Sequence, residues 1–136
     1  MTSPIATTVV SPERPLFDGH CERLVVPGWD GELGILPHHA PLIAKLGEGV
    51  LRLHLGNSDG GGVERFAVRG GFLQVKQDRV TVLVHDAVVP QDVDRASLEA
   101  ELASLLESLQ HPRSDEEFDE LLHRRGWVQA RLSLLE

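Results

Sequence analysis

The sequence predicts an α+β protein in which a β-domain over residues 1–87 precedes an antiparallel hairpin of two α-helices over residues 88–136. Two observations predict this division. Up to residue 84, short runs of Val, Leu and Ile recur about every ten residues with Gly, Pro and Asp between them, which is typical of a sandwich or barrel. After Pro90 the apolar residues recur at intervals of three and four, the spacing of one face of a helix.

Seven apolar runs are the expected strands of the β-domain, and residues that favour turns separate them. The runs cover residues 6–10, 21–26, 42–46, 50–55, 63–68, 72–76 and 80–84. Gln77 and Asp78 separate the last two runs, so a tight hairpin turn is expected there. Residues 57–62 include three consecutive glycines and form the clearest loop, because glycine adopts the positive φ angles that such connections often need.

The first expected helix carries one apolar stripe at helical intervals. The stripe comprises Leu98, Leu102, Leu105, Leu106 and Leu109. Asp92 or Asp94 is expected to cap the start of this helix, because a side-chain oxygen at that position accepts a hydrogen bond from a free backbone N–H. Pro112 ends the pattern, since proline has no N–H to donate and restricts the residue before it.

A second helix is expected to begin at the capping box formed by Ser114 and Glu117. Gly126 interrupts it at a cost of about 1 kcal/mol relative to alanine. Its apolar stripe comprises Phe118, Leu121, Leu122, Val128 and Leu132. Two helices cannot enclose a core of their own, so these stripes must meet each other, the β-domain or a partner. A hairpin that can pack on more than one surface meets the physical requirement for a conformational switch.

The composition excludes some classes of partner. The chain has 136 residues, with 13 Lys and Arg against 21 Asp and Glu, so its formal net charge is −8 at pH 7. This charge disfavours binding to nucleic acid or to an anionic bilayer. No stretch approaches the roughly 18 apolar residues of a membrane-spanning helix, so no direct membrane insertion is expected. Cys21 is the only cysteine, which excludes an intramolecular disulfide and is typical of a reducing compartment.

Neither a metal site nor a catalytic site is expected from the motifs. His38 and His39 are adjacent in an extended or turn segment, where successive side chains point to opposite sides. No pattern of metal-ligating His and Cys residues occurs. Cys21 follows His20 without a recognisable orienting carboxylate, so it is expected to be a small core residue rather than a nucleophile.

Residues 27–43 are rich in Gly and Pro, and their polar side chains include Glu32 and His39. A stiff polar loop on a β-scaffold suits recognition of another protein better than catalysis, because it displays groups without enclosing a pocket. A purely structural crossover within the β-domain explains the composition equally well, and composition alone leaves both interpretations open.

Several separated motifs resemble those of the epsilon subunit of bacterial F-type ATP synthases. The matching segments are residues 9–13, 16–19, 31–42, 66–75 and 80–87, and they occur in the order of that family. The resemblance covers essentially the whole β-domain and extends in layout to the helical hairpin. It implies a ten-stranded β-sandwich followed by two α-helices.

The resemblance also implies a non-catalytic subunit of the central rotor. Members of the family bind the gamma subunit, sit on the ring of membrane c subunits, and can extend their helices into the alpha and beta catalytic subunits to inhibit ATP hydrolysis. By this resemblance Glu32 and His39 contact the c-ring and Ser11 contacts gamma. The complex lies at the cytoplasmic face of the bacterial membrane, with this subunit peripheral to it. No cofactor or metal is implied.

An alternative function, a nucleotide-sensing regulatory module, follows from a motif that some family members use to bind ATP where the first helix begins. Asp92, Arg95 and Ala96 match that motif. Arg131 is the candidate for one of two arginines on the second helix, although Trp127 occupies the position four residues earlier. Arginines would neutralise phosphate charge there. The competing interpretation is a helix cap at Asp92 and solvated arginines.

Overall fold

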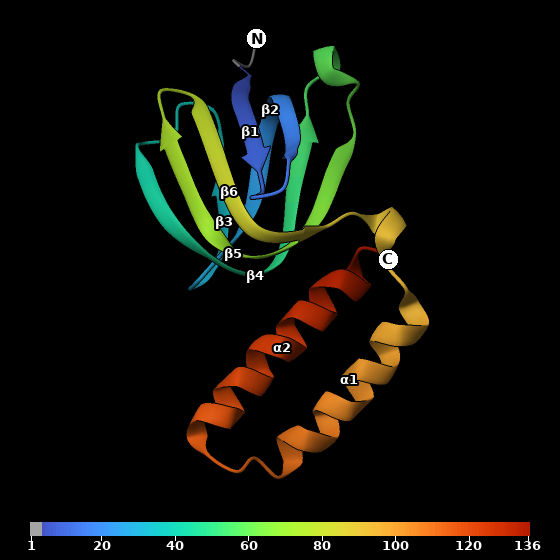
Figure 1. The fold of residues 1–136 in the computed structure, drawn as a ribbon. Coiled ribbons are helices and arrows are strands. Elements are labelled where there is room, and N and C mark those ends of the chain that lie inside the picture. Colours follow the sequence, from blue (N-terminus) through green and yellow to red (C-terminus); the bar gives the residue numbers. More distant parts are fainter. Residues whose placement is uncertain (1–3) are drawn as a thin grey trace.

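Six β-strands and two α-helices organise residues 4–136, the part of the chain that the computed structural model describes (Figure 1). The strands are β1 (Ile5–Val10), β2 (Pro15–Gly28), β3 (Gly31–Ile35), β4 (Leu42–Leu55), β5 (Val63–Lys76) and β6 (Arg79–Val88). The helices are α1 (Arg95–Gln110) and α2 (Asp115–Ser133), and short 3₁₀ turns occupy Asn57–Asp59 and Pro90–Asp92. Residues 1–3 of the expected β-domain lie outside the described residues.

The strands form a closed sheet with one extra edge strand. Their order is β1-β6-β5-β4-β2-β3, and β1 also pairs with β2, which closes the sheet around the core. The β1–β6 pair is parallel, and the other pairs are antiparallel. Apolar side chains at alternate positions fill the interior, as a half-buried strand requires. The largest fully buried members include Ile5, Leu24, Ile35, Leu46, Leu51, Leu53 and Leu73.

The order of a β-sandwich followed by a two-helix hairpin agrees with the sequence prediction, but the expected ten strands are not confirmed, because six are found in residues 4–136. The strands β4 and β5 each run through 14 residues where the sequence predicted two separate strands. Both contain glycines midway, including Gly70 and Gly71 in β5. A Cβ at Gly71, whose φ is 129°, would overlap the carbonyl oxygen of Leu83. The glycines allow the strands to continue through crowded positions that the sequence alone marks as breaks.

The predicted hairpin turn and the predicted N-cap residues are confirmed. Gln77 and Asp78 both have positive φ, 53° and 57°, and connect β5 directly to β6. The cap of α1 is Asp94, whose Oδ2 accepts a hydrogen bond from the Ser97 hydroxyl at 2.7 Å. The Ser114 hydroxyl accepts one from the Glu117 N–H at 3.0 Å at the start of α2.

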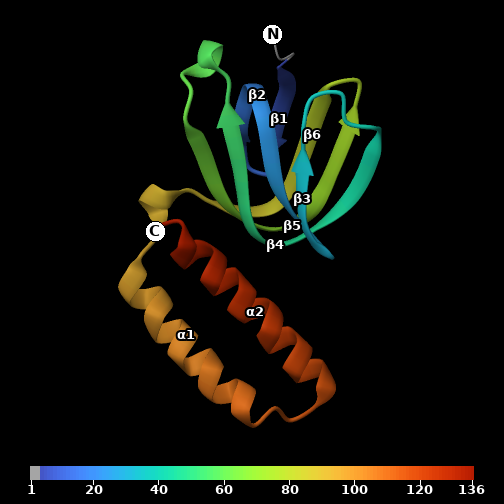
Figure 2. The ribbon, with the colours of Figure 1, turned by 180° about the vertical axis from the view of Figure 1, so that it is seen from behind.

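Both helices lie at the end of the barrel opposite the N-terminus, and α2 is the one that packs on β4 and β5 (Figures 1 and 2). The residues buried between the helices are Leu98, Leu105, Leu121 and Val128. Two members of the predicted stripes instead remain exposed, Leu106 at 44% and Phe118 at 40%. Across residues 4–136, none of the helices has both the length and the apolar character needed to cross a bilayer.

Candidate protein-interaction sites

Helix α2 has a second face that packs on the sandwich. Trp127, Ala130 and Leu134 are buried on this face together with Ala67 of β5. Their spacing of three and four residues places them on one side of the helix. This face was not predicted from the sequence, because the apolar stripe assigned to the helix contains the residues that meet α1. The same spacing, beginning at Trp127, was the available signal.

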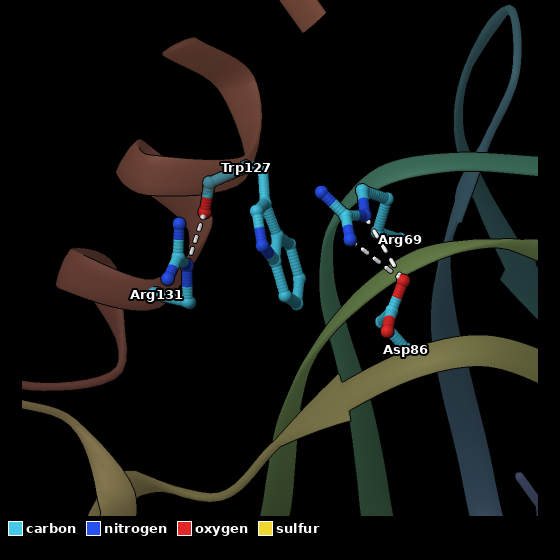
Figure 3. A network of polar contacts seen from close by, with 4 residues as sticks. All are labelled: Arg69, Asp86, Trp127 and Arg131. Atoms are coloured by element: carbon cyan, nitrogen blue, oxygen red, sulfur yellow. Dashed lines mark hydrogen bonds and ion pairs between the residues drawn. The ribbon is translucent and has the colours of Figure 1, made fainter. Parts of the chain in front are cut away.

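The indole of Trp127 lies between two guanidinium groups (Figure 3). The Arg69 Cζ atom is 5.0 Å from the ring centroid and the Arg131 Cζ atom is 4.8 Å from it. Asp86 on β6 orients Arg69 by accepting hydrogen bonds at its Oδ2 from Nε at 3.1 Å and Nη2 at 2.9 Å. Each guanidinium is attracted to the electron-rich face of the indole, so the ring joins α2 to β5.

Arg131 also connects α2 to α1. Its Nε donates a hydrogen bond to the Trp127 carbonyl oxygen at 3.3 Å, and its Nη2 lies 3.8 Å from Oε2 of Glu101. Burial lowers the pKa of Arg131 from its usual value, while Glu101 opposes that effect. The guanidinium remains charged, because an arginine does not lose its proton in a protein.

A second polar contact lies one helical turn earlier. The His123 Nδ1 atom is 3.0 and 3.1 Å from the two carboxylate oxygens of Glu48 on β4. The His123 ring stacks on Trp29 with centroids 5.4 Å apart, and the Lys45 Nζ lies 4.1 Å from the centre of the Trp29 ring. Both tryptophans of the chain therefore take part in the contact between α2 and the sandwich.

We call this contact the docking interface and define it by the helix residues His123, Trp127, Ala130 and Leu134 with Glu48, Ala67 and Arg69 of the sandwich. Arg65 of β5 extends it at the C-terminal end, where its Nη2 donates a hydrogen bond to the Leu134 carbonyl oxygen at 3.1 Å. The apolar part is small and the polar contacts are partly exposed, which is common in interfaces between the domains of one chain.

The four residues predicted to bind ATP are not joined to one another by any hydrogen bond or ion pair found in residues 4–136. Asp92 lies exposed in the turn before α1, and Arg95 pairs with Glu99 at 3.7 Å on the helix surface. Ala96 is exposed. Arg131 is already engaged by Trp127 and Glu101. Nucleotide binding therefore stays a prediction, and the engagement of Arg131 disfavours it.

Glu32 and His39, the predicted c-ring residues, lie on different parts of the structure. Glu32 is exposed near the start of β3, with its Oε2 3.5 Å from Nη2 of Arg52. His39 is half-buried in the connection between β3 and β4, where its Nδ1 bonds the Ala40 carbonyl oxygen at 2.7 Å. Of the two interpretations left open for residues 27–43, the single stiff loop is wrong, because residues 31–35 form a strand paired with β2. Glu32 also lines a hollow of about 420 Å³ beside Trp29.

The outward side of β4, β5 and β6 carries a stripe of exposed apolar side chains. Ile43 is 74% exposed, Phe72 is 52% exposed and Leu83 is 50% exposed. Phe72 is the direct cross-strand partner of Leu83, and Ile43 lies diagonally from Phe72. Ser11, in the turn between β1 and β2, lines a hollow of about 290 Å³ together with Phe72 and Leu83. We call this side of the three strands the outer face.

No cluster of three or more His, Cys, Asp or Glu side chains able to hold a metal ion occurs between residues 4 and 136. Cys21 is fully buried in the core of the sandwich, as the sequence predicted. Burial raises the pKa of its thiol, which keeps it protonated and unreactive.

Residues 5–90 match the family model described as the ATP synthase, Delta/Epsilon chain, beta-sandwich domain. The chain is 37% identical over 111 residues to the ATP synthase epsilon chain of Leptospira interrogans, which covers 82% of each protein. It is 46% identical over 103 residues to the ATP synthase epsilon chain of Alkalihalophilus pseudofirmus, which covers 74% of each.

Two solved structures share the fold. A chain of the mitochondrial ATP synthase of Euglena gracilis matches with a TM-score of 0.82 at 19% identity, covering 98% of this chain and 82% of that one. A chain from the central stalk and c-ring of the mitochondrial ATP synthase of Tetrahymena thermophila matches with a TM-score of 0.64 at 14% identity, covering 99% and 98%. At these identities the likeness concerns the arrangement of the strands and helices.

Proposed function

The chain belongs to the family of ATP synthase epsilon chains, and from that premise we propose that it turns with the central rotor and links the ring of membrane c subunits to the gamma subunit. An epsilon chain is a non-catalytic subunit of the ATP synthase complex. A subunit that transmits torque needs a stiff body and adequate contact surfaces rather than a cofactor or a general base. The closed sandwich, with its fully buried aliphatic core, provides such a body.

The main support for this proposal is the apolar stripe on the outer face. Exposed apolar side chains that are contiguous on a folded surface mark sites of protein contact. Phe72 and Leu83 form such a pair, and the hollow beside them includes Ser11, the residue predicted to contact gamma. We assign the outer face to the gamma subunit.

The c-ring contact is assigned to Glu32 and His39. The exposure of the Glu32 carboxylate supports this assignment, because Glu32 and Trp29 line the same hollow. A polar loop of the c-ring would find both a charged and an apolar partner there. His39 lies beyond β3, so the two residues would engage the ring at separate points. On this proposal the subunit lies peripherally at the cytoplasmic face of the bacterial membrane.

The helical hairpin, residues 88–136, is assigned a regulatory role. Its helices bury one face against each other and another, on α2, against the sandwich. Release of the docking interface would free the hairpin to reach the alpha and beta catalytic subunits and restrain ATP hydrolysis. A ligand or partner shifts the equilibrium between the docked and the released hairpin only through contacts that differ between these two states. The contacts of Trp127 and His123 with the sandwich are of this kind.

Co-expression with the gamma subunit tests the rotor assignment. The full chain and a chain truncated after residue 88 should both copurify with gamma, because the outer face lies entirely on the sandwich. In the reconstituted complex the truncated chain should allow faster ATP hydrolysis than the full chain. Failure of the full chain to bind gamma at micromolar concentration would contradict the rotor assignment, and unchanged hydrolysis would remove only the regulatory role.

A further inference from the structure

The outer face has a charge opposite to that of the chain as a whole. The formal net charge of the protein is −8, yet both of its lysines, Lys45 and Lys76, and Arg79 lie exposed on this face. The outward strand positions around the apolar stripe are Ile43, Lys45, Phe72, Gln74, Lys76, Arg79, Thr81 and Leu83, and none of them is acidic. The apolar centre of the outer face thus has a cationic border.

Within residues 4–136, the cations at this border have no acidic partner. Lys76 and Arg79 are direct cross-strand partners, an arrangement that is destabilising because the charges are alike. Asp78, in the turn between them, is instead engaged by His38, whose Nδ1 lies 3.2 Å from its Oδ2. None of the ion pairs found in residues 4–136 includes Lys45, Lys76 or Arg79. A partner with carboxylates at these positions would offset the repulsion.

Hollows beside the cations can receive side chains of a partner. One of about 250 Å³ is lined by Gln74, Lys76, Gln77, Arg79 and Thr81. A second, of about 460 Å³, is lined by Ile43, Gln74 and Lys76 among others. Carboxylates of a partner would fit in the hollows beside Lys76 and Arg79. Apolar side chains of the partner would fit in the hollow that Ser11 and Phe72 line.

We infer that the outer face binds a protein surface whose apolar centre is bordered by Asp and Glu side chains, and that this surface belongs to the gamma subunit. The inference rests on the proposed function and adds the charge of the partner's surface. A second copy of this chain is a poor occupant, because a symmetric pair would bring the same cationic borders together. An anionic bilayer is also a poor occupant, because the remaining surface of the chain is acidic.

The test is the association rate of the full chain with immobilised gamma subunit at 50 and 300 mM NaCl, measured by surface plasmon resonance. The variant Lys76→Gln/Arg79→Gln removes the two positive charges that face each other across β5 and β6. The matched control, Arg113→Gln/Arg124→Gln, removes two exposed positive charges from the hairpin. Lys45 is left unchanged because it stacks on Trp29. Circular dichroism checks that each variant is folded.

The wild-type association rate should fall with salt, and at 50 mM NaCl the Lys76→Gln/Arg79→Gln variant should associate about tenfold more slowly, with a dissociation rate within about threefold of wild type. The matched control should associate at the wild-type rate. Equal rates for both variants and the wild type, with gamma still bound, would overturn the inference while leaving the proposed function intact. Wild-type protein that binds anionic vesicles or dimerises through this face, while not binding gamma, would overturn both.

Discussion

Trp127→Ala removes the side chain that joins the hairpin to the sandwich, and the structure predicts that α2 then separates more readily from β4 and β5 without unfolding of the barrel. The indole is 8% exposed and lies between Arg69 and Arg131. Its loss leaves Ala67 and Ala130 facing an empty space, and both guanidinium groups lose the ring face that they contact.

The magnitude follows from the area that the ring buries. A large aromatic side chain buries roughly 150–250 Å², and at about 25 cal/mol per Å² this corresponds to roughly 4–6 kcal/mol. Part of that area is covered by Arg131 of the same helix and is not lost on separation. We therefore expect the variant to lose about 3 kcal/mol of docking free energy, the lower end for truncation of a buried Trp. This is roughly a factor of 100 in the docking equilibrium.

Hydrogen exchange of the full-length protein measures the effect directly. The amides of α2 should exchange with an opening free energy about 3 kcal/mol lower than in wild type, while amides of the barrel core, such as that of Val82, keep theirs. Leu106→Ala, on the exposed side of α1, is the control and should change the free energy of unfolding by less than about 0.5 kcal/mol. Protection of α2 reduced by less than about 1 kcal/mol in Trp127→Ala would refute the role assigned to the indole.

Three further predictions concern single residues. Gly126→Ala should raise the free energy of unfolding by about 1 kcal/mol in urea titrations, because a Cβ there meets the Glu48 Cβ at an ordinary 3.7 Å; an unchanged midpoint would contradict this. Cys21 should react with a thiol reagent at pH 8 only after urea unfolds the chain, since burial raises its pKa, and labelling at the rate of free cysteine in native protein would contradict its burial. Hydrogen bonds from the Ser97 hydroxyl and amide lower the pKa of Asp94 below its usual 3.8, so the cap contributes stability above that pH and loses it as the pH falls through the lower folded-state value. NMR of the Ser97 amide should show this acid transition in wild type and not in Asp94→Asn.

Features that depend on a few neighbouring residues could be predicted from the sequence. The turn at Gln77 and Asp78 and the caps at Asp94 and Ser114 are set by local backbone chemistry, and each forms where the pattern placed it. The burial of Leu98 and Leu121 also follows from helical spacing, because these positions face the partner helix wherever the hairpin lies.

Features that depend on distant segments could not be predicted in this way. The sequence pattern predicts strand ends at the glycines of β4 and β5. Both strands continue through these glycines because they remain paired with neighbouring strands. The docking face of α2 involves Trp127, whose partner Arg69 is far away in sequence, so a helical pattern cannot identify the contact. The separation of Glu32 from His39 likewise follows from the pairing of β3 with β2.

Photochemical cross-linking from position 11 tests most directly whether the chain turns together with gamma. Since Cys21 is buried, Ser11→Cys supplies the reactive thiol for a benzophenone maleimide. In membrane vesicles containing the complete ATP synthase, illumination should join the chain to gamma and leave ATP synthesis unchanged, because two parts of one rotor do not move relative to each other. Loss of ATP synthesis in proportion to the gamma cross-link would show that the two subunits move past each other and would contradict the account.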